Sequence, residues 1–233
     1  MLLIDIGNST TVIADYHHSK IEEKCCLNTP LFAETFDASQ FKKKHLWVSS
    51  VVPWVDPLFK SLPLTHMMTY QTIPKLKIAV KKPEQVGADR LVNALAAHYL
   101  YQKNTLIIDL GTALTFCYVS ENGVYNGGAI FPGGNIAAKA LNHYTAKIPL
   151  ILPKKILKKI GQTTKEAVQI GLYQGYVYLI NGFIQDFRKQ YPKGLVIGTG
   201  QGLDMLKDKL ELDHYDPQLI LKGLAFCANN HSS

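Results

Sequence analysis

Apolar residues are concentrated in short runs of strand length, and one arrangement of these runs occurs twice along the chain. In each half, a continuous apolar run, as expected of a strand buried on both faces, is followed by two strand-like stretches after short polar turns. These stretches are 2–6, 11–16 and 21–26 in the first half, and 106–110, 114–119 and 124–130 in the second. We interpret the recurring order of strand, turn, strand, turn, strand as an internal duplication of a domain-sized unit.

The remaining segments predict further helices and strands in each half. Apolar residues at helical spacing predict a helix over 84–101 with Leu91, Leu95 and Tyr99 on one face, and a long helix is expected over 164–190. Also expected are a strand at 46–51, a helix begun by Pro53, weaker strands around Thr65 and Leu76, a helix ending near His143, a strand at 194–198, and two closing helices split by Asp216-Pro217.

Three-strand meanders followed by helices and further strands, present twice, predict an α/β fold. The pattern is typical of the duplicated actin-like, ribonuclease H-like (ASKHA) fold of the actin, hexokinase and Hsp70 class. We expect two ribonuclease H-like domains, residues 1–102 and 103–233, that share a cleft because no low-complexity linker divides them. Function must then be argued from the sites, because one fold hosts many activities.

The composition is that of an ordinary globular protein. With 47% hydrophobic residues, the 233-residue chain can bury a sizeable core. No apolar run approaches the roughly 18 residues of a membrane helix. Asp5 interrupts the amino-terminal run, so we expect no signal peptide and a cytoplasmic protein. The four cysteines form no Cys-x-x-Cys motif, and neither a disulfide framework nor a zinc site is indicated.

The chain is basic, with a formal net charge of +7 and a pI near 9.1. Such a balance is compatible with nucleic acid, a membrane surface or small anionic substrates. The lysine clusters at 42–44 and 154–159 have no interleaved aromatic residues on which bases could stack. We therefore favour solvated lysines and expect no nucleic-acid or membrane partner.

Each half ends its first strand with an aspartate followed two positions later by a glycine, at Asp5 and Gly7 and again at Asp109 and Gly111. The glycine allows the backbone to turn tightly around a ligand. Around Asp5, the following amide and hydroxyl side chains suit the phosphates of a nucleotide and its Mg²⁺, which needs only one or two protein carboxylates. For Asp109 three interpretations stay open: a Mg²⁺ shell, a monovalent cation site, or a plain turn residue.

Asp89 and Arg90 stand side by side early in the helix predicted over 84–101. An aspartate there is often only a helix-terminal residue, favoured by capping and by the helix dipole. In a phosphotransferase, however, the acceptor hydroxyl needs a carboxylate that takes its proton, and a guanidinium group can hold an anionic acceptor. Both interpretations stay open on these residues alone.

The glycine-rich stretch 198–202 follows a predicted strand. Its G-x-G-x-G spacing does not place the third glycine where a Rossmann fingerprint needs it, so a loop on the nucleoside side of a site fits better. The sequence contains no Walker A motif, no G-x-S-x-G elbow and no Cys/His signature, which argues against P-loop kinases and common hydrolases.

With these motifs assembled, the chain closely resembles the type III pantothenate kinases over nearly its whole length. The matching stretches are DIGNST from Asp5, SSVVP from Ser49, PEQVGADRLVNALAA from Pro83, IDLGTALTF from Ile108, GGAIFPG from Gly127, ALNHYTAKIP from Ala140, GQTTKEAVQIGLYQG from Gly161 and DPQLILKGL from Asp216. The resemblance implies an actin-like homodimer that uses ATP to phosphorylate pantothenate, the first step of coenzyme A biosynthesis.

The resemblance also implies roles for individual residues. Asp89 would be the catalytic proton acceptor, and Asp109 would bind a monovalent cation, K⁺ or NH₄⁺. The Mg²⁺ of ATP is assigned to Asp5 from the chemistry of its loop described above. The implied ATP-binding residues are Asp5, Ile6, Gly7, Asn8, Ser9, Thr10, Thr11, Val12 and Thr112. The implied substrate-binding residues are Gly87, Ala88, Asp89, Arg90 and Thr164.

One departure from the family pattern concerns the substrate site. Val80 stands nine positions before Asp89, where family members often carry a tyrosine. The main alternative function is a non-catalytic transcriptional accessory protein on the same fold, and a kinase for another small hydroxylated acid is a further one.

Overall fold

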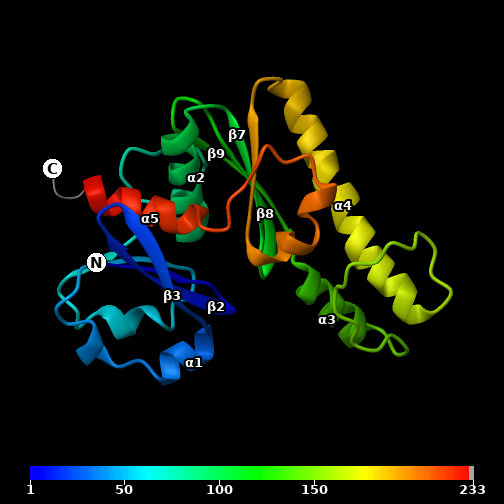
Figure 1. The fold of residues 1–233 in the computed structure, drawn as a ribbon, viewed down its shortest axis with the longest axis horizontal. Coiled ribbons are helices and arrows are strands. Elements are labelled where there is room, and N and C mark those ends of the chain that lie inside the picture. The colour runs from blue at the N-terminus through cyan, green and yellow to red at the C-terminus, as the bar shows by residue number, and fades with distance from the viewer. Residues whose placement is uncertain (231–233) are drawn as a thin grey trace. The chain divides into compact units, whose positions relative to one another are not determined.

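The computed structural model describes residues 1–230, which form two compact units (Figure 1). The first unit contains residues 1–102, 119–127 and the chain from Gln218 onward, and the second contains 103–118 and 128–217. The strands are β1 Leu2–Ile6, β2 Thr10–His17, β3 Lys20–Asn28, β4 Leu46–Ser50, β5 Thr65–Met67, β6 Lys77–Ile78, β7 Thr105–Leu110, β8 Ala113–Val119, β9 Val124–Pro132, β10 Leu195–Thr199 and β11 His214–Tyr215. The α-helices are α1 Thr29–Glu34, α2 Ala88–Tyr101, α3 Gly134–Tyr144, α4 Thr164–Gln190 and α5 Leu219–Asn230.

The first sheet has five strands in the order β3-β2-β1-β4-β5. β1 pairs antiparallel with β2 and parallel with β4, so that Asp5 lies opposite Val12 on one side and Ser49 on the other. One face of the sheet carries the alternate residues Leu2, Ile4 and Ile6, which pack in an apolar core. The other face is covered by α2 and α5, which also contact each other.

The second sheet has six strands in the order β11-β10-β7-β8-β9-β6. Apart from β6 at one edge, the order β9-β8-β7-β10-β11 repeats β3-β2-β1-β4-β5 strand for strand, and β10 is parallel to β7 as β4 is to β1. The predicted duplication is therefore confirmed. The core of the second unit is built from β7, β8 and β10 against α4, whose buried residues include Tyr176, Ile180 and Ile184.

The carboxyl-terminal helix α5 belongs to the first unit, which departs from a plain division into 1–102 and 103–233. The reason lies at Gly223 of α5, where an added Cβ atom would lie 2.4 Å from the backbone oxygen of Val92 in α2. The absence of a side chain allows these two helices to approach closely. The pair lies side by side in Figure 1.

Several expected elements differ in detail from those observed. The predicted helix over 84–101 starts only at Ala88, because Pro83–Gln85 forms a separate 3-10 turn, and Tyr99 is 56% exposed although Leu91 and Leu95 are buried. The helix expected after Pro53 is a short 3-10 helix, Asp56–Phe59, and the first of the two closing helices is a pair of 3-10 turns. The long helix α4 has the predicted bounds. Within residues 1–230, no helix is both long and apolar enough to span a bilayer.

Candidate functional site

The first candidate loop joins β1 to β2 at the carboxyl end of β1. The amide of Gly7 donates to the oxygen of Thr10 at 2.9 Å and closes a tight turn. Asp5 is partly buried at the strand end, whereas Asn8, Ser9 and Thr10 are exposed and present one amide and two hydroxyl groups to solvent. These three side chains lie outside the core, and their chemistry suits a ligand rich in oxygen atoms.

Thr29 stabilises this loop through hydrogen bonds, and the sequence analysis did not identify it. Its Oγ1 donates to the oxygen of Gly7 at 2.6 Å and lies 3.0 Å from Oγ1 of Thr11, while its backbone amide donates to the oxygen of Ser9 at 3.1 Å. Both threonines are fully buried. The hydroxyl of Thr11 is thus engaged inside the protein, so the predicted contact of Thr11 with ATP would have to use its backbone.

Asp89 lies in the first turn of α2 and has a defined orientation. Its Oδ1 accepts from the amide of Arg90 at 2.8 Å, and a Cβ atom added to Gly87 would lie 2.5 Å from the same oxygen. The carboxylate therefore folds back over Gly87. Burial raises the pKa of Asp89 above its ordinary value, a shift opposed by the hydrogen bond from the Arg90 amide and by the charge of Arg90.

Contacts within the first unit bring Asp89 near the first loop. A Cβ atom on Gly87 would lie 3.2 Å from Cγ1 of Val51, which follows β4. The amide of Val51 in turn donates to the oxygen of Ile6 at 3.1 Å. The segment 87–90 and the end of β1 thus meet at the carboxyl ends of two parallel strands, the edge at which open α/β sheets bind ligands.

Arg90 is supported by an aromatic residue that sequence reasoning did not identify. The guanidinium carbon of Arg90 lies 5.8 Å from the ring centroid of Tyr125, a residue of β9 that is fully buried. A guanidinium group over a tyrosine face is held by a cation–π attraction. The contact fixes the position of a positive charge one residue from Asp89.

The second candidate loop, in the second unit, joins β7 to β8. Asp109 is partly buried at the end of β7 and lies opposite Thr199 of β10. The amide of Gly111 donates to the oxygen of Ala113 at 2.9 Å, so the turn is one residue shorter than its counterpart after Asp5. Thr112 is half-buried within this turn.

Glycines from two other segments cross this second turn closely. A Cβ atom added to Gly133 would lie 2.3 Å from the backbone oxygen of Thr112. A Cβ atom added to Gly200 would lie 2.3 Å from Oδ1 of Asp109. Gly200 also has a positive φ of 86°. The structure thus gathers the β9–α3 turn and the 198–202 stretch around Asp109, as a ligand loop would require.

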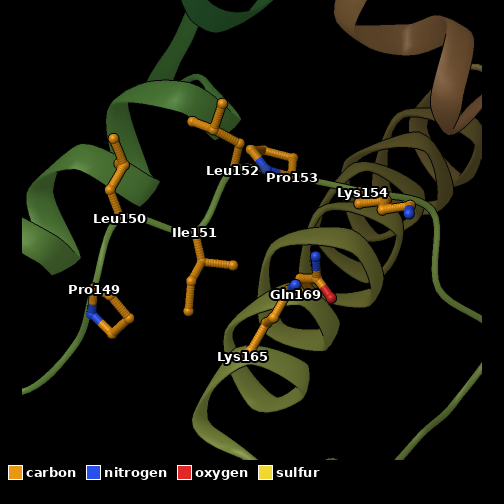
Figure 2. Close-up of a pocket in the computed structure, with 8 residues that line it drawn as sticks. All are labelled: Pro149, Leu150, Ile151, Leu152, Pro153, Lys154, Lys165 and Gln169. Carbon is orange, nitrogen blue, oxygen red and sulfur yellow. The ribbon is translucent and has the colours of Figure 1, made fainter.

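Thr164 is the first residue of α4 and is exposed. The preceding Thr163 caps the helix, because its Oγ1 accepts from the amide of Glu166 at 3.2 Å. In the following residues of α4, Lys165 and Gln169 face the segment 149–154, which is apolar except for Lys154, across a cavity of about 480 Å³ (Figure 2). Thr164 directly precedes Lys165, one of the residues that line this cavity.

The donor set suits Mg²⁺ better than a transition metal. In the described part of the chain, no three His, Cys, Asp or Glu side chains gather into a metal-binding group. Mg²⁺ commonly keeps several waters and uses one or two carboxylates together with the phosphates of a substrate. A single carboxylate at Asp5, beside exposed hydroxyl groups, fits this mode of binding.

The structure brings some of the predicted residues together and leaves the grouping of others open. Residues 5–12 and 87–90 lie in the first unit, whereas Asp109, Thr112 and Thr164 lie in the second. That the loops of both units face a common cleft stays a prediction.

Comparison with known proteins agrees with this geometry. Residues 1–186 match the family profile of the type III pantothenate kinases. A type III pantothenate kinase of Sulfurihydrogenibium is 32% identical over an alignment of 248 positions, which covers 97% of this chain and 98% of that one. A second one, from Listeria monocytogenes, is 31% identical over 96% of this chain and 95% of its own length.

Solved structures share the fold. A Campylobacter jejuni protein assigned to the Baf family of transcriptional activators superposes with a TM-score of 0.69 at 22% identity, covering 100% of this chain and 99% of that one. A ROK hexokinase from Thermus thermophilus gives a TM-score of 0.54 at 11% identity, with both chains fully covered. These similarities confirm the duplicated fold of sugar kinases. The chain belongs to the type III pantothenate kinase family.

Proposed function

We propose that the protein transfers the γ-phosphate of ATP to the primary hydroxyl of pantothenate. The observation that carries this proposal is the position of Asp89, a partly buried carboxylate with a raised pKa beside the first loop of the same unit. A carboxylate so placed can receive a proton from a bound hydroxyl group. Membership of the family supplies the identity of the acceptor.

In the proposed reaction, the oxygen of pantothenate forms a bond to the γ-phosphorus while the bond from that phosphorus to the β-phosphate oxygen breaks and ADP leaves. The hydroxyl proton passes to Asp89. Because phosphoryl transfer proceeds through a loose transition state, the main tasks of the protein are to position the reactants and to offset charge. The pKa of Asp89, raised by burial, makes its carboxylate a better proton acceptor than an ordinary aspartate.

Binding of the two substrates is assigned to separate groups. The exposed side chains of Asn8, Ser9 and Thr10 would bind the nucleotide phosphates, and Asp5 would hold Mg²⁺ through its water shell. When bound, Mg²⁺ offsets the negative charge of the phosphates. Arg90, fixed over Tyr125, would pair with the carboxylate of pantothenate.

The second loop would complete the nucleotide site. We assign Thr112 to the ATP phosphates and Asp109 to a monovalent cation, K⁺ or NH₄⁺. The close crossing of Gly200 over the Asp109 carboxylate supports a defined site at this point. The other two interpretations of Asp109, a Mg²⁺ shell or a turn residue, predict activity that does not depend on the monovalent cation.

We further propose a cytoplasmic homodimer, with Thr164 near the acceptor site. Support for the dimer comes from exposed apolar residues of the second unit: Tyr144 and Ile160 are 82% and 81% exposed, and Leu150 and Leu152 line the cavity of Figure 2. Exposed apolar side chains that gather on one surface mark protein–protein contacts. Light scattering that gave a monomer at micromolar concentration would contradict the dimer.

A coupled assay of ADP release tests the function. We expect release that requires pantothenate and is faster in K⁺ than in Na⁺ buffer, and no release from an Asp89→Asn variant that still binds ATP. Steady release of ADP without pantothenate would contradict the assignment of pantothenate as the phosphate acceptor. A steep, salt-dependent affinity for DNA in a protein without kinase activity would favour the transcriptional alternative instead.

A further inference from the structure

Ser49 of β4 carries a buried hydroxyl group that the folded protein leaves unused. Its side chain is wholly buried, and within residues 1–230 its Oγ makes no hydrogen bond. A buried hydroxyl without a partner destabilises a protein, because the group loses its bonds to water and gains none in return. A group of this kind calls for a physical explanation, such as a role in a site.

The neighbouring serine shows that local structure does not require a free hydroxyl here. Oγ of Ser50 lies 2.5 Å from Oδ1 of Asp56, to which it donates, and it accepts from the amide of Val52 at 3.2 Å. Ser50 thus shapes the turn after β4. Ser49, one residue earlier, points to the opposite face of the sheet, because successive side chains of a strand alternate.

The register of the sheet places Ser49 beside Asp5. The two residues are directly paired across the parallel strands β4 and β1, so both side chains lie on the same face. That face is opposite to the one formed by Ile4, Ile6 and Val48, which pack in the apolar core. The Ser49 hydroxyl is therefore close to the carboxylate assigned to the magnesium–nucleotide complex.

The second half of the chain repeats this pairing. Thr199 of β10 lies opposite Asp109 of β7 in the equivalent parallel pair, and it is also buried. Each half therefore places a hydroxyl residue beside the aspartate that ends its first strand. Both copies of the duplicated unit thus keep a hydroxyl residue at this register position, although the residue itself differs between them.

We propose that Ser49 is a positioning residue for Asp5: in the nucleotide-loaded protein its hydroxyl donates to the Asp5 carboxylate and holds it in the orientation that receives the magnesium–nucleotide complex. This inference rests on the nucleotide-binding part of the proposed function. It accounts for a hydroxyl that is costly in the unloaded protein and useful only once the ligand is bound.

Thr65 of β5 offers a matched control. Its Oγ1 is also buried without a hydrogen-bond partner among residues 1–230, and it lies in the same sheet. It is paired with Leu46, at the amino end of the parallel strands and therefore away from Asp5. Ser49→Ala and Thr65→Val each remove one unused hydroxyl, but only the first removes it beside the site.

The experiment compares wild type, Ser49→Ala and Thr65→Val in two measurements: thermal unfolding without ligand, and calorimetric binding of a non-hydrolysable ATP analogue with Mg²⁺. We expect both variants to melt at or above the wild-type temperature, since each loses an unsatisfied group. Only Ser49→Ala should bind the analogue about tenfold more weakly, the effect of losing one hydrogen bond to a charged group.

Wild-type affinity in Ser49→Ala, or an equal loss of affinity in Thr65→Val, would overturn the positioning role. A lower melting temperature of the unliganded Ser49→Ala protein would overturn it as well, since the hydroxyl would then be structural. Failure of the proposed function would give a different result: the wild-type protein would bind the analogue but would release no ADP when pantothenate is added.

Discussion

Gly87 controls the position of the Asp89 carboxylate, and replacing it with alanine tests the catalytic assignment. The backbone of Gly87 has a φ of −58° and a ψ of 141°, which alanine adopts without strain. The effect of Gly87→Ala must therefore come from its added methyl group. That group would lie 2.5 Å from Oδ1 of Asp89 and 3.2 Å from Cγ1 of Val51.

The size of the effect follows from these distances. To reach the ordinary contact distance of 3.4 Å from 2.5 Å, the carboxylate oxygen must move by about 0.9 Å. Such a move also weakens the 2.8 Å hydrogen bond from the Arg90 amide that orients the group. A misplacement of about 1 Å in a catalytic group lowers a rate roughly 100-fold. We expect this loss in kcat, with little change in the affinity for ATP.

Steady-state kinetics with saturating pantothenate measures kcat, and calorimetry with an ATP analogue measures nucleotide binding. Gly182→Ala in α4 is the matched control, because a methyl group there meets no atom within 4 Å. It should keep wild-type kcat and melt slightly higher, since alanine favours a helix. A Gly87→Ala enzyme with wild-type kcat would refute the assignment of Asp89 as the proton acceptor.

Three further substitutions test other parts of the site. Asp89→Asn should abolish turnover without lowering the melting temperature at neutral pH, because a carboxyl group with a raised pKa disfavours folding once it ionises. The raised pKa also predicts that wild-type activity falls on the acid side at a pH above 3.8, the ordinary pKa of an aspartate. Thr29→Val removes the 2.6 Å hydrogen bond to Gly7, and we expect about 1–3 kcal/mol less stability in urea unfolding together with a higher KM for ATP. Gly200→Ala would place a methyl group 2.3 Å from Oδ1 of Asp109 at a φ of 86°, so it should reduce the activation by K⁺; unchanged activation would count against a cation site at Asp109.

The sequence by itself determined the fold class, the duplication and most of the elements. The reason is that these depend on local patterns: apolar runs of strand length predicted β1 and β7, and helical spacing predicted α4 from Thr164 to Gln190. It also indicated Asp5, Asp89 and Asp109, because a carboxylate beside a glycine or at a helix start has a recognisable setting. The helix expected over 84–101 began later than predicted because Pro83 formed its own turn.

Only the tertiary structure decided what lies beside these aspartates. Thr29 beside the first loop, Tyr125 beside Arg90, and Ser49 beside Asp5 are each far from their partners in the chain, and no local pattern shows which residue each one contacts. The packing of α5 on α2 through Gly223 is likewise a long-range contact. Strand register and burial set these neighbours, and both are properties of the folded sheet rather than of any segment of the sequence.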